Sequence, residues 1–223
     1  MARILHVPSQ PAASFWLPIV DLVRQGGLLA VATESTYAVA ASVSVAHALD
    51  RVVEVKRRPS GKPILVLIAD RTQLDVLVHV VPSWAEAVLN AWWPGPLTVI
   101  FHAHPHVSHA LTAGTGTIGI REPAPAFLRT LLRHTGPLTG TSANRSGAMP
   151  CATAKEVQAS LGHDIDLILD TGPAPGHRPS TLLSVVDKPV MLRTGPVSAR
   201  EIQSVLSEAG LAVEVQGDGV RQT

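Results

Sequence analysis

Side chains able to bind anions are grouped at a few points of the chain, and each group adjoins a short apolar run. The groups are Thr33–Tyr37, Lys56–Lys62, Thr141–Gly147, Arg121 and Arg193. Their hydroxyl, amide, ammonium and guanidinium groups bind phosphate and carboxylate. Ligands of open α/β sheets collect where strands end, so the pattern predicts one site for a ligand that carries both kinds of anion.

Several common catalytic and nucleotide-binding motifs are absent from the sequence. It has no phosphate-binding loop of the G-x-x-x-x-G-K-[ST] type, no G-x-G-x-x-G after an expected strand, and no G-x-S-x-G elbow. A nucleotide would therefore be held by scattered side chains and helix starts.

Each polar group also has a structural explanation. Lys56–Arg58 could complement a helix dipole, Thr33–Tyr37 could form an ordinary turn, and Ser142–Asn144 could cap the next helix. Arg121 and Arg193 could pair with acids such as Glu122 or Asp170. The residue types alone leave these alternatives open.

Apolar runs and amphipathic segments interleave along the chain. Short apolar runs predict strands at Leu28–Ala32, Ile64–Ala69, Leu97–Phe101, Thr117–Arg121, Leu167–Asp170, Thr181–Val186 and Val190–Arg193. Helices are expected at Ser14–Arg24, Ala46–Val55, Gln73–His79, Trp84–Trp92, Ala126–Leu132, Ala154–Leu161 and Ala199–Glu208. Because several late strands follow one another directly, we expect a single α/β domain with a mixed sheet over residues 12–208, and a short frayed tail over 209–223.

The composition excludes some classes of protein. Of 223 residues, 46% are apolar, which supplies a core and excludes global disorder. Eighteen basic and 17 acidic residues leave a net charge of +1, so the whole surface does not suit a polyanion. The sequence has one cysteine, and its N-terminus has no signal-peptide pattern. Both features favour a soluble, cytoplasmic protein that does not associate with a membrane.

Four histidines lie close together between residues 102 and 109. His102, His104 and His106 alternate, so a strand would place them on one face, as a zinc site requires. Pro105 interrupts that strand and no cysteine or carboxylate flanks the group. We expect a solvated hairpin tip and no metal site.

The order of the polar groups resembles the YrdC-like family of threonylcarbamoyl-adenylate synthases over about residues 15 to 200. Six family motifs occur in order. They are carried by Thr33, Glu34, Ser35 and Tyr37; Lys56, Arg58, Pro59, Lys62, Pro63 and Ile64; Trp93–Thr98; Ile120, Arg121 and Pro123; Ser142, Ala143, Asn144, Ser146 and Gly147; and Gly172, Ser180, Thr181, Arg193 and Gly195. The chain departs from the family where Ala38-Val39-Ala40 replaces Gly-Leu-Gly, and where Leu67 replaces a histidine of some members.

The resemblance implies the YrdC-like (DHBP synthase-like) fold and a reaction that joins L-threonine, bicarbonate and ATP. The products would be threonylcarbamoyl-AMP and pyrophosphate, and the former would serve a downstream threonylcarbamoyl transferase complex that modifies adenosine 37 of tRNA. The enzyme would be a nucleotidyltransferase, with Mg²⁺ carried by the ATP phosphates.

The resemblance also assigns roles to residues. Lys56 and Arg58 would be catalytic and face the triphosphate. L-threonine would be held by Thr33, Tyr37, Arg121 and Ser180. The nucleotide would be held by Lys56, Arg58, Lys62, Thr117, Ser142, Asn144 and Arg193.

Two other functions fit the same resemblance. One is a module that binds tRNA or double-stranded RNA without synthase activity, which the net charge of +1 disfavours. The other is a carbamoyl-adenylate-forming relative that uses carbamoyl phosphate. Pyrophosphate exchange that depends on threonine and bicarbonate would separate these functions.

Overall fold

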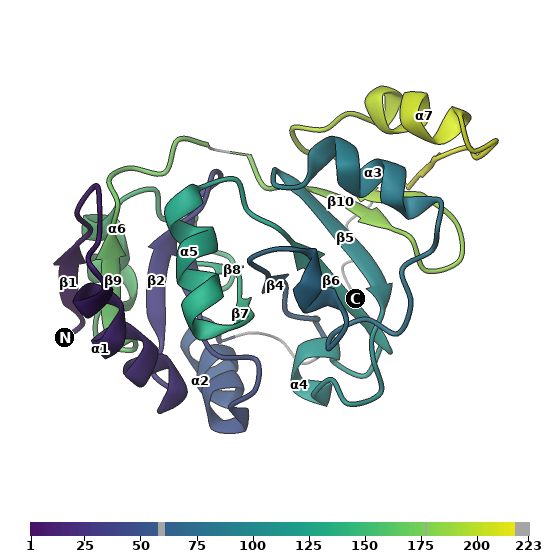
Figure 1. Cartoon of the computed structure of the whole chain (residues 1–223). Coiled ribbons are helices and arrows are strands. Elements are labelled where there is room, and N and C mark those ends of the chain that lie inside the picture. The colour runs from purple at the N-terminus through teal and green to yellow at the C-terminus, as the bar shows by residue number, and fades with distance from the viewer. Residues whose placement is uncertain (58–60, 177, 217–223) are drawn as a thin grey trace.

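A computed structural model describes residues 1–57, 61–176 and 178–216. The described residues form two sheets with helices packed around them (Figure 1). One sheet has the strand order β1 (Arg3–His6), β9 (Leu167–Asp170), β2 (Leu29–Ala32), β3 (Tyr37–Ala40) and β8 (Thr141–Ser142). The other has the order β12 (Glu214–Val215), β11 (Val190–Arg193), β10 (Thr181–Ser184), β5 (Leu97–His102), β6 (Thr117–Arg121), β4 (Val66–Leu67) and β7 (Leu138–Thr139).

Both sheets mix parallel and antiparallel pairs, which confirms the predicted fold class. In the first sheet β2 pairs parallel with β9 and antiparallel with β3. In the second, β5 pairs parallel with β10 and antiparallel with β6. Such pairing follows from the sequence, because hairpins join some neighbouring strands while helical crossovers join others.

Two apolar clusters hold the helices to the sheets. The helices are α1 (Ala13–Arg24), α2 (Ala46–Lys56), α3 (Ala85–Trp92), α4 (His109–Thr112), α5 (Ala126–Thr135), α6 (Ala154–Leu161) and α7 (Ala199–Ser207). Ile19 of α1 and Leu131 of α5 pack with Val31 of β2 in one cluster. The larger cluster joins α2, α3, α6 and α7 to both sheets, and α3 lies beside α7 (Figure 1). No described helix is long and apolar enough to cross a bilayer.

The structure corrects one local prediction. The helix expected at Gln73–His79 is wrong: a 3₁₀ helix spans Arg71–Leu74, where the Asp70 carboxylate accepts from the backbone amide of Thr72 at 3.1 Å. Asp70 thus favours a short turn over a longer helix. Ala38-Val39-Ala40, where the family has Gly-Leu-Gly, lies in the buried strand β3.

Pairing extends beyond the expected limits of residues 12–208. β1 lies parallel to β9, and β12 lies parallel to β11 through Glu214 and Val215. Part of the segment predicted to fray is therefore paired, whereas residues 217–223 lie outside the described residues. The domain limits themselves stay a prediction.

Candidate ligand-binding site

A cavity of about 370 Å³ lies between the two sheets. Its walls come from the loop after β2, from β3 and β8 of the first sheet, and from β5, β6, β10 and β11 of the second. The polar lining residues are Thr33, Ser35, Thr36, Thr98, Thr117, Arg121, Thr141, Ser142, Ser180 and Arg193. Hydroxyls and two guanidinium groups therefore face one space, as the sequence predicts for an anionic ligand.

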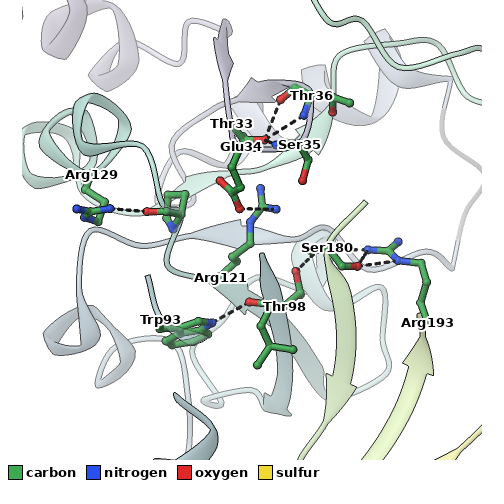
Figure 2. Close-up of polar contacts among 12 residues, drawn as sticks. Thr33, Glu34, Ser35, Thr36, Trp93, Thr98, Arg121, Arg129, Ser180 and Arg193 are labelled. Atoms are coloured by element: carbon green, nitrogen blue, oxygen red, sulfur yellow. Dashed lines mark hydrogen bonds and ion pairs between the residues drawn. The ribbon is translucent and has the colours of Figure 1, made fainter. Parts of the chain in front are cut away.

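The loop between β2 and β3 is held by the hydroxyl of Thr33. Thr33 Oγ1 donates to the Thr36 carbonyl at 2.8 Å and accepts from the Ser35 amide at 3.0 Å (Figure 2). The Thr33 hydroxyl is thus already used by the protein, and Ser35 and Thr36 are presented to the cavity beside it. Ser and Thr make such local bonds readily, which explains why they occur in this turn.

Arg121 forms a buried ion pair with an acid that the sequence analysis left without a role. Its Nη1 lies 3.2 Å from Glu34 Oε1, and their side chains are only 4% and 16% exposed (Figure 2). The alternative in which Arg121 pairs with an acid is therefore found, but the acid is Glu34 and not Glu122. Among the described residues, neither Glu34 carboxylate oxygen nor Arg121 Nε has a hydrogen-bond partner, so the two side chains interact as an ion pair.

Arg193 reaches the cavity from the end of β11 and is held by Ser180. Its Nε and Nη2 donate to the Ser180 carbonyl at 3.1 and 2.9 Å, and Ser180 Oγ lies 2.7 Å from Thr98 Oγ1 (Figure 2). Within the described chain Arg193 forms no ion pair, so the suggested pairing with Asp170 is not found. Gly195 allows this arrangement, because a Cβ there would lie 2.3 Å from the Thr181 nitrogen.

The two guanidinium groups give the cavity a positive potential. Burial lowers the pKa of Arg121, and the nearby Glu34 carboxylate opposes that effect. Burial also lowers the pKa of Arg193, and the positive charge of Arg121 lowers it further. Two cations that share a poorly solvated space, only one of which is paired with a carboxylate among the described residues, favour an additional anion.

Lys56 lies behind the cavity rather than in its lining. Its side chain is buried, and Nζ donates to the carbonyls of Ser142 and Asn144 and to Asn144 Oδ1, the last at 3.0 Å. Asn144 Nδ2 in turn donates to the carbonyls of Arg145 and Ala148. The ammonium group therefore fixes the loop that presents Ser142 to the cavity.

Tyr37 points away from the cavity, although its neighbour Ala38 lines it. Strand side chains alternate, so the Tyr37 ring is fully buried in the core and its hydroxyl donates to the Gly172 carbonyl at 2.8 Å. Burial, followed by the nearby charge of Asp170, raises the pKa of Tyr37 to about 12. Tyr37 anchors the connection from β9 to β10, where Gly176 lies so close to Glu34 that a Cβ would be 2.3 Å from its carbonyl oxygen.

The structure brings together six of the predicted site residues. Those that line the cavity are Thr33, Thr117, Arg121, Ser142, Ser180 and Arg193. Lys56 and Asn144 stand behind it, Tyr37 faces the core, and Lys62 is exposed and not part of the lining. Arg58 lies outside the described residues.

Sequence reasoning missed several lining residues, among them Thr98 and Gly119. Alternation along Thr117–Arg121 could have found Gly119, because residues 117, 119 and 121 must share one face of a strand. Thr98 ends the Trp93–Thr98 motif but was given no role, and it lines the cavity in contact with Ser180, which is 82 positions away. No local pattern contains that information.

The lining contains no carboxylate, and no group of three or more potential metal ligands converges among the described residues. In the histidine segment, the rings of His104 and His106 lie 4.9 Å apart, and the amide of His106 approaches His104 Nδ1 at 3.4 Å. This segment begins at the end of β5 and does not contribute to the cavity lining.

Two mixed sheets around a cavity of hydroxyl and guanidinium groups define an α/β protein with a cavity suited to a small anionic ligand. The chain belongs to the Sua5, YciO and YrdC family, which is described as "Telomere recombination" and matches residues 21–195. The match covers the cavity lining from Thr33 to Arg193.

Named relatives and solved structures agree with this assignment. A threonylcarbamoyl-AMP synthase of Bacillus subtilis is 36% identical over 188 residues, which are 83% of this chain and 54% of the relative. The structure of Pyrococcus abyssi Sua5 complexed with L-threonine has a TM-score of 0.88 at 29% identity, and the match covers 96% of this chain and 63% of that one. The structure of Escherichia coli YciO has a TM-score of 0.79 at 25% identity, and the match covers 90% of this chain and 99% of that one. The chain thus spans little more than half of the Bacillus relative.

Proposed function

We propose that this protein is a nucleotidyltransferase that makes threonylcarbamoyl-AMP from L-threonine, bicarbonate and ATP. Pyrophosphate and water would be the other products. The observation that supports the proposal most is the cavity itself, which holds Arg121 and Arg193 beside the hydroxyls of Thr98 and Ser180. Relatives named for this reaction, and a related structure complexed with L-threonine, favour the same chemistry.

The proposed reaction needs positioning and charge neutralisation more than a covalent intermediate. A carbamate formed from threonine and bicarbonate attacks the α-phosphorus of ATP, and pyrophosphate leaves. Arg121, whose guanidinium group belongs to the cavity lining, suits the α-carboxylate of threonine. Arg193, which lacks a carboxylate partner in the described chain, suits the phosphates, whose negative charge it would stabilise as the bond breaks.

Mg²⁺ is part of this proposal as a companion of ATP. The ion keeps most of its waters and binds few protein groups, so the hydroxyl-rich lining without carboxylates is compatible with Mg²⁺ carried by the phosphates. When bound, Mg²⁺ would neutralise charge on the triphosphate. Cytoplasmic location, delivery of the product to a transferase complex and contact with tRNA belong to the same proposal.

The test is pyrophosphate release by the purified full chain. We expect release only when ATP, threonine and bicarbonate are all present, with mass-spectrometric detection of threonylcarbamoyl-AMP. An Arg193→Gln variant serves as the matched loss-of-charge control and should release at most a few per cent as much. Release without threonine, or use of carbamoyl phosphate in place of bicarbonate, would favour the carbamoyl-adenylate alternative. Tight RNA binding without release would favour the RNA-binding alternative.

A further inference from the structure

Gly119 lies in the middle of β6, where glycine has no evident structural purpose. Its neighbours Ile118 and Ile120 are fully buried in the core, whereas Thr117, Gly119 and Arg121 face the cavity. Glycine weakens a strand interior because it has no side chain to pack and loses the most backbone freedom on folding. Its presence at this position therefore needs a reason.

Two of the usual reasons do not apply to Gly119. Its backbone is not in the left-handed region that favours glycine. A Cβ built at Gly119 would make only ordinary contacts, at 3.5 Å to Thr98 Cγ2, 3.9 Å to Ile100 Cγ1 and 4.0 Å to Leu65 Cδ1. Gly140, which also lines the cavity, differs, because a Cβ there would lie 2.5 Å from Leu67 Cγ. Packing thus requires glycine at 140 and permits alanine at 119.

The remaining reason for a glycine within a strand is the close approach of another group. The three heavy atoms nearest to a methyl group at Gly119 are all side-chain atoms of the cavity lining, so among the described residues no backbone beyond its chain neighbours approaches that position more closely. The space above Gly119 is part of the cavity. A ligand is therefore the group that would use it.

The surroundings of Gly119 indicate which part of a ligand fits. Ile100 pairs with Gly119 across the strands, and with Leu65 it forms an apolar floor. Arg121 lies two residues along β6, about 6.6 Å away at the usual strand rise, and Thr117 lies equally far on the other side. A flat part of a ligand over Gly119 would thus have the apolar floor beneath it and the Thr117 hydroxyl beside it, next to the amino acid proposed at Arg121.

We propose that Gly119 determines nucleotide binding by leaving room for the nucleoside part of ATP against β6. This inference rests on the proposed function, because it takes ATP as the ligand. A methyl group at position 119 would occupy the contact surface of the nucleoside without disturbing the fold. The affinity for ligands that lack a nucleoside, such as pyrophosphate, would not change.

The experiment compares wild type with Gly119→Ala and Gly119→Val by calorimetric titration with ATP and Mg²⁺, with pyrophosphate and with threonine. We expect Gly119→Ala to weaken ATP binding about 10-fold or more, since one misplaced methyl group changes affinity by about 10- to 200-fold. Gly119→Val should weaken ATP binding further. Pyrophosphate and threonine affinities and the melting temperature should stay near those of wild type.

Ser184→Thr is the matched control, because it adds a methyl group on the second sheet outside the lining. ATP binding by Gly119→Ala within twofold of wild type would overturn the inference, as would weakened threonine binding with unchanged ATP binding. A wild-type protein that binds no ATP would instead overturn the proposed function. The two failures are therefore distinguishable.

Discussion

Arg121 and Glu34 form an ion pair that joins the cavity wall to the loop after β2. The Nη1–Oε1 distance is 3.2 Å, and the pair links Thr117–Arg121 of one sheet to the loop that follows β2 of the other. Removing one partner of a buried pair leaves an uncompensated charge, which costs more than the pair contributes while intact. The Glu34 carboxylate therefore compensates the buried positive charge of Arg121 even when the cavity holds no ligand.

Glu34→Gln should lower the free energy of unfolding by about 3 kcal/mol, the usual cost of breaking a buried pair. Chemical denaturation measures this change. The control is Glu86→Gln, which removes the more exposed Arg71–Glu86 pair and should cost less than about 1 kcal/mol. Equal stability of the two variants would show that Glu34 does not compensate Arg121.

Lys56→Met should impair folding and activity together. The methionine fills the volume but cannot donate to Ser142 and Asn144, so we expect a loss of about 2–3 kcal/mol in denaturation experiments. Lys155→Met, on the exposed face of α6, is the control and should be near neutral. A Lys56→Met protein of normal stability and reduced turnover would support the direct phosphate contact predicted from the sequence.

Arg121→Lys should reduce kcat/KM for threonine and for serine by similar factors, of about 10-fold or more. A point charge cannot reproduce the guanidinium fork that is expected to hold the α-carboxylate, and both amino acids share that group. Pyrophosphate-release kinetics at saturating bicarbonate provide the measurement. If Arg121→Lys were as active as wild type, the amino acid would bind elsewhere.

Ala38→Gly should reduce the preference for threonine over serine, which we expect to be roughly 10- to 200-fold in wild type. The Ala38 methyl group lines the cavity, whereas Ala40 packs in the core with α1 and α5. Ala40→Gly is therefore the matched control: it should cost stability and leave the preference unchanged. Competition kinetics with the two amino acids measure the ratio. An unchanged ratio in Ala38→Gly would remove Ala38 from the amino-acid pocket.

Tyr37 should ionise at a pKa of about 12 in the native protein, against about 10 when unfolded. Because the folded-state pKa is raised, its contribution to stability is complete below pH 10 and is lost as pH rises towards 12. Tyr37 is the only tyrosine, so tyrosinate absorbance reports on it directly. In Tyr37→Phe, the loss of stability that Tyr37 ionisation causes between about pH 10 and 12 should be absent. Native ionisation near pH 10 would contradict the buried hydroxyl contact with Gly172.

Local patterns predicted the strands and helices around the site, and the polar groups at their ends. They placed Thr33, Ser142 and Arg193 near one another correctly, because such groups gather where strands end. They could not predict that Lys56 turns inward to the Ser142–Asn144 loop, or that Glu34 pairs with Arg121. These contacts join residues 86 to 88 positions apart, and depend on how the strands are paired.

The cavity between the two sheets makes any bound ligand a cross-link. Ala38 and Ser142 belong to the first sheet, while Thr98 and Arg121 belong to the second, so a molecule that contacts all four holds the two halves together. Fluctuations that separate the sheets must then expel the ligand, and the binding free energy adds to the cost of those fluctuations. A bound ligand would thus slow amide hydrogen exchange in strands of both sheets, including strands that do not contact the ligand.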